Sequence, residues 1–255
     1  MTAATATDSP PGRTTVDPAE IERFSRIAAE WWDPAGKFRP LHKFNPVRLA
    51  WLRDVICKAH GRDPHAPRPL QGLRIIDVGC GGGLLSEPLA RLGASVTGID
   101  AAEKNVKTAA AHAAETGVDV DYRAATAEDL VQAGEQFDVV LAMEIVEHVA
   151  DVDLFLGAVS ALARPGGLVF MATLNRTAKG WLLGIVAAEY ILRWLPRGTH
   201  DWKRFLKPSE LTGALRRTGV EVRELTGVAY NPISDRFSLA PRDLDVNYML
   251  WGVRG

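Results

Sequence analysis

The sequence is poor in the residues that mark several classes of protein. Its 255 residues include two cysteines, Cys57 and Cys80, too few for a disulfide framework or a cysteine zinc site. The formal net charge is -1, so the chain has no general field to attract nucleic acid, and an RNA or DNA partner is disfavoured. No charged segment leads into an apolar run near the first residue, so we expect no secretory signal. Reduced thiols then suit a cytoplasmic protein.

What remains is the composition of a soluble globular domain. Hydrophobic residues make up 47% of the chain and charged residues 24%, which is ordinary, and the length is sufficient to bury a full core. Residues 1–16 are rich in Thr, Ala, Pro and Gly, and we expect a disordered tail there. We interpret residues 17–60 as an N-terminal helical cap, residues 61–72 as a Pro-rich linker and residues 73–255 as the core.

The cap is predicted to contain two helices. Asp17 followed by Pro18 is typical of a helix start, with the aspartate as N-cap and the proline in the first turn. A second helix is expected to begin at Asn45 and Pro46, and to carry Arg48. Aromatic and basic residues are frequent in this segment, so it is more than a plain surface decoration.

A strand that runs into a glycine-rich turn is the central feature of the sequence. The strand is predicted over 74–78, and the turn follows in Asp77-Val78-Gly79-Cys80-Gly81-Gly82-Gly83. Glycine removes Cβ atoms where backbone must approach a ligand, and it allows positive φ angles. The dinucleotide fingerprint would require a third glycine at position 84, which is Leu84.

The turn instead fits the loops that bind S-adenosylmethionine (SAM). SAM has no pyrophosphate and carries a sulfonium cation, so an acid at the end of the strand is favourable. We therefore predict cofactor contacts at Asp77, Gly79 and Gly81, with Cys80 as a small packing residue. The alternative is a turn that only connects a strand to a helix.

Two further acids are candidates for cofactor binding. Asp100 ends a strand predicted over 95–100 and lies 21 positions after Gly79. This is close to the spacing of about 20 at which an Asp or Glu binds the ribose hydroxyls, so we predict that role for Asp100. Glu128 opens a later helix and is our candidate for contacting the adenine amino group. An acid favourably placed in the first turn of a helix is the alternative.

Strands and helices alternate through the core. The first five strands are predicted over 74–78, 95–100, 120–124, 137–142 and 168–173, with helices between them. This order implies a mostly parallel sheet with right-handed crossovers. Strands over 220–225 and 246–251, after a helix over 208–218, complete an α/β, Rossmann-like fold of seven strands with helices on both faces; residues 227–232 are expected to be an irregular loop. The loops after strands one, two and four should meet at one crevice, because ligands bind beyond the carboxyl ends of such strands.

Acidic and imidazole side chains follow the fourth strand. If a helix begins at Glu144, then Glu144, Glu147 and His148 lie on one face of it. His148, oriented by a carboxylate such as Glu147, is suited to remove the proton of a phenol, whose pKa near ~10 makes it a poor nucleophile at neutral pH. The same three side chains are also suited to hold a hard divalent ion such as Mg²⁺. A third interpretation assigns the acids to the helix N-terminus and His148 to packing.

A strongly apolar segment lies beyond the fifth strand, within an insertion over 177–207. Only Glu189 and Arg193 interrupt the apolar residues from Trp181 to Leu195. Fifteen residues are too few to span a bilayer, which needs about 20. Tryptophans near both ends and the surrounding basic residues are typical of a helix that lies among lipid headgroups, so we expect contact with a membrane surface. A buried core helix is the alternative.

Several long strings resemble the bacterial ubiquinone-biosynthesis O-methyltransferases. Besides the glycine turn, these are Trp31-Trp32-Asp33-Pro34, Pro40-Leu41-His42-Lys43-Phe44-Asn45-Pro46-Val47-Arg48-Leu49, Thr173-Leu174-Asn175-Arg176, Gly198-Thr199-His200-Asp201-Trp202 and Asp245-Val246-Asn247-Tyr248-Met249-Leu250. The resemblance covers residues 18–254. It implies a class I SAM-dependent methyltransferase that methylates a 2-polyprenyl-6-hydroxyphenol and a 3-demethylubiquinol.

The resemblance also implies roles for particular residues. It places cofactor contacts at Arg48, Gly79, Asp100 and Met143, and in eukaryotic relatives a divalent metal at the positions of Glu144, Glu147 and His148. An insoluble polyprenyl substrate implies a protein attached peripherally to the inner face of the cytoplasmic membrane, with other ubiquinone-biosynthesis proteins as partners. Two other functions are compatible with the residues: methylation of a different lipophilic phenol, or a non-catalytic subunit that binds SAM or lipid.

Overall fold

The computed structural model describes residues 14–182 and 201–255 and is built around an eight-stranded sheet. The strands are β1 Arg74–Val78, β2 Ser95–Asp100, β3 Asp121–Ala124, β4 Phe137–Met143, β5 Ala163–Leu174, β6 Val220–Asn231, β7 Arg236–Ala240 and β8 Asn247–Arg254. The helices and 3-10 turns are α1 Pro18–Ile27, η1 Ala28–Glu30, α2 Arg39–Ala59, α3 Ser86–Arg91, α4 Glu103–Thr116, α5 Ala127–Gln132, η2 Val146–His148, α6 Val152–Leu162, α7 Ala178–Gly180, η4 Trp202–Arg204 and α8 Pro208–Arg217.

The sheet has the order β3-β2-β1-β4-β5-β8-β6-β7. Strands β1 to β5 pair in parallel, and β8 lies antiparallel between β5 and β6. The predicted α/β class and its mostly parallel sheet are confirmed. From β1 the chain adds β2 and β3 on one side and then β4 and β5 on the other, and the last strand, β8, inserts between β5 and β6. The switch point between β1 and β4 is where a ligand crevice is expected.

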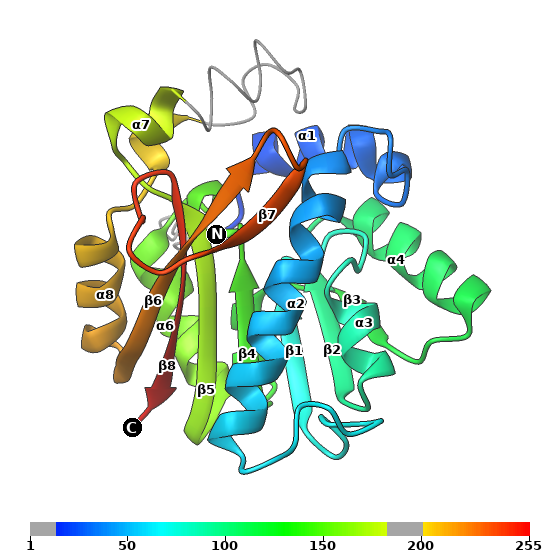
Figure 1. Cartoon of the computed structure of the whole chain (residues 1–255). Helices are drawn as coiled ribbons and strands as arrows, with labels where there is room; N and C mark the ends of the chain where they lie inside the picture. Colours follow the sequence, from blue (N-terminus) through cyan, green and yellow to red (C-terminus); the bar gives the residue numbers. More distant parts are fainter. Residues whose placement is uncertain (1–13, 183–200) are drawn as a thin grey trace, which may run out of the picture.

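Two hydrophobic cores form because helices cover both faces of the sheet. Ile75 of β1 belongs to the cluster that contains Trp51 of α2 and Leu89 of α3. Its neighbour Ile76 points to the opposite face, into the cluster that contains Phe155 of α6. Figure 1 shows α2 across one face of the sheet, and α1 at the end to which the arrow of β4 points.

The sheet has one strand more than predicted because β6 is longer than expected and an unpredicted strand, β7, pairs with its end. Residues 227–231 continue β6 and pair with β7, with Tyr230 opposite Phe237. The expected irregular loop at this position is therefore wrong, and the sheet has eight strands instead of seven. Glycine is required at position 227 because a Cβ there would lie 1.7 Å from the carbonyl oxygen of Asp243. Gly227 is therefore a strand residue at a site of close backbone approach and not a turn residue.

The cap is confirmed at its start and corrected at its second helix. Asp17 caps α1, and its carboxylate accepts a hydrogen bond of 3.0 Å from Ala19 N. Helix α2, however, begins at Arg39, so Pro46 lies inside the helix and Asn45 is not its cap. Proline removes one helical hydrogen bond, and the packing of this helix against the sheet overrides that local preference.

The segment before the cap and the outer surface add two observations. Thr15, placed by the prediction in a disordered tail, is buried, and its carbonyl accepts a hydrogen bond from Ala150 N.

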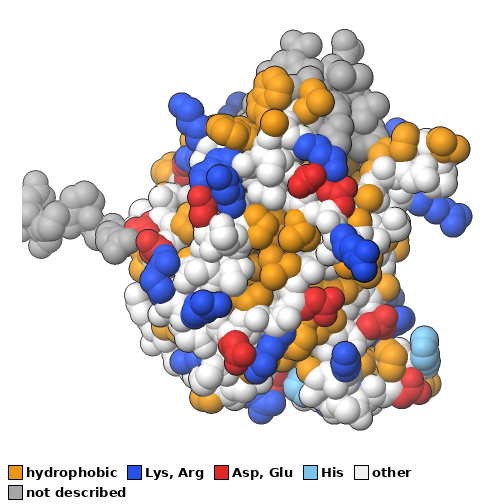
Figure 2. Space-filling view, turned by 60° about the vertical axis from the view of Figure 1, so that its left-hand side comes forward, with side chains coloured by type: hydrophobic (Ala, Val, Ile, Leu, Met, Phe, Trp, Pro, Cys, Tyr) orange, Lys and Arg blue, Asp and Glu red, His pale blue; other side chains and the backbone are white. Residues whose placement is uncertain are grey.

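Figure 2 brings the β6 and α8 side forward and shows hydrophobic side chains gathered in its central part between charged ones. Within residues 14–182 and 201–255, no helix is long and apolar enough to cross a membrane.

Candidate active site

A cavity of about 710 Å³ opens beyond the carboxyl ends of β1, β2 and β4, where the crevice was predicted. Helices α1 and α2 and the β6–β7 hairpin supply its other walls. Most of the predicted site residues line it, namely Arg48, Asp77, Gly79, Gly81, Asp100, Met143, Glu144, Glu147 and His148. Glu128 does not line this cavity, and none of the described residues hydrogen-bonds its two buried carboxylate oxygens. Its contact with adenine stays a prediction.

The glycine turn after β1 needs glycine for two physical reasons. Gly79 and Gly81 have φ angles of 74° and 54°, in the left-handed region that side chains disfavour. A Cβ at Gly79 would lie 2.8 Å from Ile145, and one at Gly81 would lie 2.4 Å from the ring of Trp31. Gly81 N donates a hydrogen bond of 3.0 Å to Asp100, so the turn and the acid after β2 form one unit.

Two adjacent tryptophans fasten the cap to this turn. Trp31 Nε1 donates to Asn105 at 2.9 Å, and Asn105 donates in turn to Asp100 at 3.3 Å. Trp32 Nε1 donates to the carbonyl of Gly82 at 2.8 Å. Both tryptophans belong to a string that carries the family resemblance, but the sequence alone indicated no role for them. The structure places them directly against the candidate cofactor loop.

Arg48 and Asp77 are both buried and both line the cavity. Burial lowers the pKa of the Arg48 guanidinium, while the charges of Glu144 and Asp77 act in the opposite direction. Its terminal nitrogen donates to Asn45 at 3.0 Å, whereas its buried Nε has no hydrogen-bond partner among the described residues. A buried cation facing a cavity is suited to hold a ligand carboxylate.

The pKa of Asp77 is shifted in the opposite direction to that of Arg48. Burial raises the pKa of its carboxyl to about 6, although the hydroxyl of Ser86 donates to it at 2.6 Å. Burial likewise raises the pKa of the Cys80 thiol well above its usual value, and Asp100 and Asp77 add to that effect. The thiol therefore stays neutral, which suits the packing role expected from the sequence.

The segment after β4 is not the helix that the sequence suggested. Glu144 has a φ angle of 56°, and only a short 3-10 turn follows at η2, so the three side chains do not share a helical face. The orienting carboxylate of His148 comes from elsewhere in the chain. His148 Nδ1 lies 3.0 Å from Glu20 on α1, a residue that the sequence analysis did not select. Only tertiary packing brings these two together.

Glu20 is an anion near neutral pH. Burial acts to raise the pKa of its carboxyl, but hydrogen bonds from His148 and Arg23 outweigh that effect and the pKa is lowered. An ionised Glu20 keeps the proton of His148 on Nδ1. The other ring nitrogen, Nε2, then carries the lone pair that a general base requires. A histidine with a carboxylate at Nδ1 is suited to act as a general base.

Glu147 is a buried acid with a different environment. Burial and the nearby charge of Glu144 raise the pKa of its carboxyl, and Thr173 donates a hydrogen bond to it at 2.9 Å. The carboxyl group of Glu147 is therefore a weaker acid than that of Glu20 and keeps its proton to a higher pH. Among the described residues, no group of three or more His, Cys, Asp or Glu side chains is arranged to hold a metal. A metal at Glu144, Glu147 and His148 stays a prediction.

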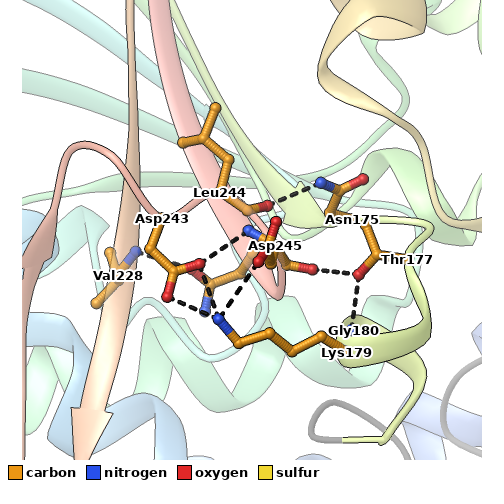
Figure 3. Close-up of polar contacts among 9 residues, drawn as sticks. Asn175, Thr177, Lys179, Gly180, Val228, Asp243, Leu244 and Asp245 are labelled. Carbon is orange, nitrogen blue, oxygen red and sulfur yellow. Dashed lines mark hydrogen bonds and ion pairs between the residues drawn. The ribbon is translucent and has the colours of Figure 1, made fainter.

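A polar network joins α7 to the segment between β7 and β8 (Figure 3), and two of its residues, Lys179 and Asp243, line the cavity. Lys179 of α7 contacts Asp243 at 2.8 Å and Asp245 at 3.4 Å. Asn175 donates to the carbonyl of Leu244 at 2.8 Å. These contacts fix the segment between β7 and β8 to the end of β5, at the point where the predicted insertion over 177–207 begins. Residues 183–200 of that insertion, with most of the predicted apolar helix, lie outside the described residues.

Comparison with known proteins identifies close relatives. Residues 76–171 match the family described as a methyltransferase domain. A ubiquinone biosynthesis O-methyltransferase from Brucella anthropi is 60% identical over 242 residues, covering 95% of this chain and 97% of the relative. A protein of the same name from Sinorhizobium fredii is 60% identical over 238 residues, covering 93% of this chain and 96% of the relative.

Solved structures of more distant proteins share the fold. The magnesium protoporphyrin IX methyltransferase of Synechocystis PCC 6803, with bound SAH, is 24% identical with a TM-score of 0.60 and covers 93% of this chain and 95% of its own. A SAM-dependent methyltransferase from Thermotoga maritima is 18% identical with a TM-score of 0.57 and covers 93% and 99%. The predicted Rossmann-like methyltransferase fold is therefore confirmed.

Proposed function

Since the chain belongs to the family of ubiquinone biosynthesis O-methyltransferases, we propose that it transfers a methyl group from SAM to the phenolic hydroxyl of a 2-polyprenyl-6-hydroxyphenol and of a 3-demethylubiquinol. One observation supports this most directly. A single cavity is lined by the glycine turn, by Asp100 and Arg48, and by the Glu20–His148 pair. The residues proposed to bind the cofactor and the proposed general base therefore line the same cavity.

The residues divide the work between cofactor binding and proton removal. SAM supplies, when bound, a methyl group on a positively charged sulfur that an oxygen nucleophile attacks in line. Asp100 holds the ribose, Arg48 faces the carboxylate, and the turn at Gly79 allows close backbone approach. Met143, buried at the end of β4 and lining the cavity, would pack beside the cofactor. His148 removes the phenol proton at Nε2, and Glu20 stabilises the resulting imidazolium at Nδ1.

The proposed reaction is tested with purified protein, SAM and short-chain catechol or demethylubiquinol analogues. We expect an O-methylated product, and calorimetric binding of both SAM and its demethylated product. Binding of SAM without any product would favour a non-catalytic subunit. Turnover of unrelated lipophilic phenols with no turnover of demethylubiquinol analogues would favour a different substrate. Activity that survives exhaustive chelation would remove the predicted divalent metal from the reaction.

Attachment to the inner face of the cytoplasmic membrane is a second part of the proposal. Support comes from the edge of the insertion over 177–207, where Trp181 is 48% and Leu182 is 50% exposed. An exposed tryptophan beside an exposed leucine suits the boundary between lipid and water.

We expect Trp181→Ala to reduce flotation with anionic liposomes. Ile233→Ala is the control, since Ile233 is 96% exposed but lies in the turn between β6 and β7. Equal flotation of wild type and Trp181→Ala would contradict membrane contact at this residue. Other ubiquinone-biosynthesis proteins are proposed as partners only on the basis of the family.

A further inference from the structure

One side of the cavity lies against the β6–β7 hairpin. Residues 227–231 of β6 pair only with β7, whereas residues 220–226 pair with β8, so the hairpin extends past the sheet. It packs there on α2, where Phe44 contacts Phe237. We call this side of the cavity the hairpin chamber, defined by Phe44, Val228, Tyr230 and Phe237.

Aromatic side chains form the wall of the hairpin chamber. The ring centroids of Phe44 and Phe237 are 5.4 Å apart, and those of Tyr230 and Phe237 are 5.0 Å apart. The other neighbour of Phe44 is Arg48, whose guanidinium carbon lies 4.7 Å from the centroid of the Phe44 ring. Phe44 therefore borders the chamber on the side of this buried cation.

Charged groups at the border of the chamber are paired with each other. On the α2 side, Lys43 forms an ion pair with Asp235, which also accepts a hydrogen bond from the Tyr230 hydroxyl. On the α7 side, Lys179 pairs with Asp243 at 2.8 Å (Figure 3). The first pair holds the tip of the hairpin to α2, and the second holds the segment after β7 to α7. Between the two pairs lies the aromatic wall of the chamber, in contrast to the Glu144, Glu147 and Arg48 side chains elsewhere in the cavity.

We propose that the hairpin chamber binds the hydrophobic substituent of the phenol ring, and that Phe237 determines specificity for that substituent. The inference rests on the proposed function, because the reacting hydroxyl must reach His148. A hydrocarbon substituent gains free energy only where it leaves water for an apolar surface, and the chamber provides that surface.

The test compares substrates that differ only in the substituent. We measure kcat/KM for catechol and for catechols that carry one and two isoprenoid units, with wild type and Phe237→Ala. Wild type should prefer the substituted catechols. Phe237→Ala should lower kcat/KM for them by roughly tenfold, as expected for lost contact in an apolar pocket, and leave catechol within about twofold. The SAM affinity should be unchanged, which also shows that the variant is folded.

The matched control is Leu239→Ala. Leu239 lies two residues along β7, is 42% exposed and does not line the cavity, so its loss should affect no substrate selectively. Equal losses for catechol and for substituted catechols in Phe237→Ala would overturn the proposal, as would an equal selective loss in Leu239→Ala. If Phe237→Ala fails to bind SAM, Phe237→Leu is measured in the same way, with a smaller selective loss expected and an unselective one contradicting it.

Failure of this inference is distinguishable from failure of the proposed function. If wild type methylates neither catechol nor any substituted catechol, the proposed reaction is wrong, and so is the assignment of the chamber as the site for the substituent. If wild type methylates all of them with the same kcat/KM, the reaction stands and the chamber proposal is wrong. In Val228→Phe the chamber is narrowed, so the two-isoprenoid substrate should lose more than catechol; equal effects on both contradict the assignment.

Discussion

Replacing Glu20 by glutamine tests the general base through its partner. The substitution keeps the size of the side chain but removes the charge that holds the proton of His148 on Nδ1. The two side chains are only 16% and 10% exposed, so solvent does not replace the lost interaction. A hydrogen bond to a charged group contributes about 1.5–3 kcal/mol. At 1.36 kcal/mol per tenfold, kcat should fall roughly 10- to 150-fold.

The assay separates proton removal from binding. We expect Glu20→Gln to lower kcat for demethylubiquinol analogues and to leave the calorimetric affinity for SAM unchanged. With a nitro-substituted catechol the loss should shrink, because a more acidic phenol depends less on the base. A role in packing alone would lower the rate for both substrates by the same factor.

Glu22→Gln is the control for this experiment. Glu22 lies on the same helix, is 68% exposed and pairs only loosely with Arg26 at 3.4 Å. Its replacement should change kcat by less than about twofold, since exposed ion pairs contribute little. If Glu20→Gln has the same kcat as Glu22→Gln, or the same loss on both catechols, the assignment of Glu20 and His148 is refuted.

Three further predictions concern the cofactor end of the cavity and the core. Arg48→Met should weaken SAM binding by roughly tenfold or more in calorimetry, because a charge-assisted contact to the carboxylate is lost; unchanged affinity would exclude that contact. Gly81→Ala should lower both Tm and SAM affinity, because its Cβ would lie 2.4 Å from the Trp31 ring, whereas Gly157→Ala in open space should raise stability by about 0.5–1 kcal/mol. The pKa of Asp77 is raised from 3.8 to about 6, so between these pH values the folded protein keeps a proton that the unfolded chain loses. Wild type should therefore lose about 3 kcal/mol of unfolding free energy as pH rises from about 4 to about 6. Urea unfolding of Asp77→Asn should not show this loss, and the same pH dependence in both proteins would contradict the prediction.

The parallel half of the sheet was predictable from the sequence because its signals are local. β1 and β2 have the expected bounds, and Asp100 and the glycine turn meet because parallel strands end at one edge. The hairpin of β6 and β7 was not predictable in the same way. Gly227 and the Asn231-Pro232 pair are typical of a loop, and the close approach of Asp243 that explains the glycine exists only in the folded chain.

The active site was predictable in its parts but not in its pairing. Glu144, Glu147 and His148 do line the cavity, yet the positive φ of Glu144 ends the helical register that the spacing suggested. Glu20 was missed because it lies 128 positions before His148, and an acid in the first turn of a helix is unremarkable by itself. No periodic pattern connects the two. Their contact depends on how α1 docks.

The burial of Thr15 bears on how this chain can be shortened. The Ala150 amide bonds to its carbonyl, just after the segment that carries His148, and Thr15 and Val16 both contribute to the cavity wall. A chain that begins at residue 17, where the first helix is capped, would keep every described helix and strand but would lose this part of the cavity wall. We expect such a shortened chain to give an unchanged circular dichroism spectrum and a lower rate of methylation.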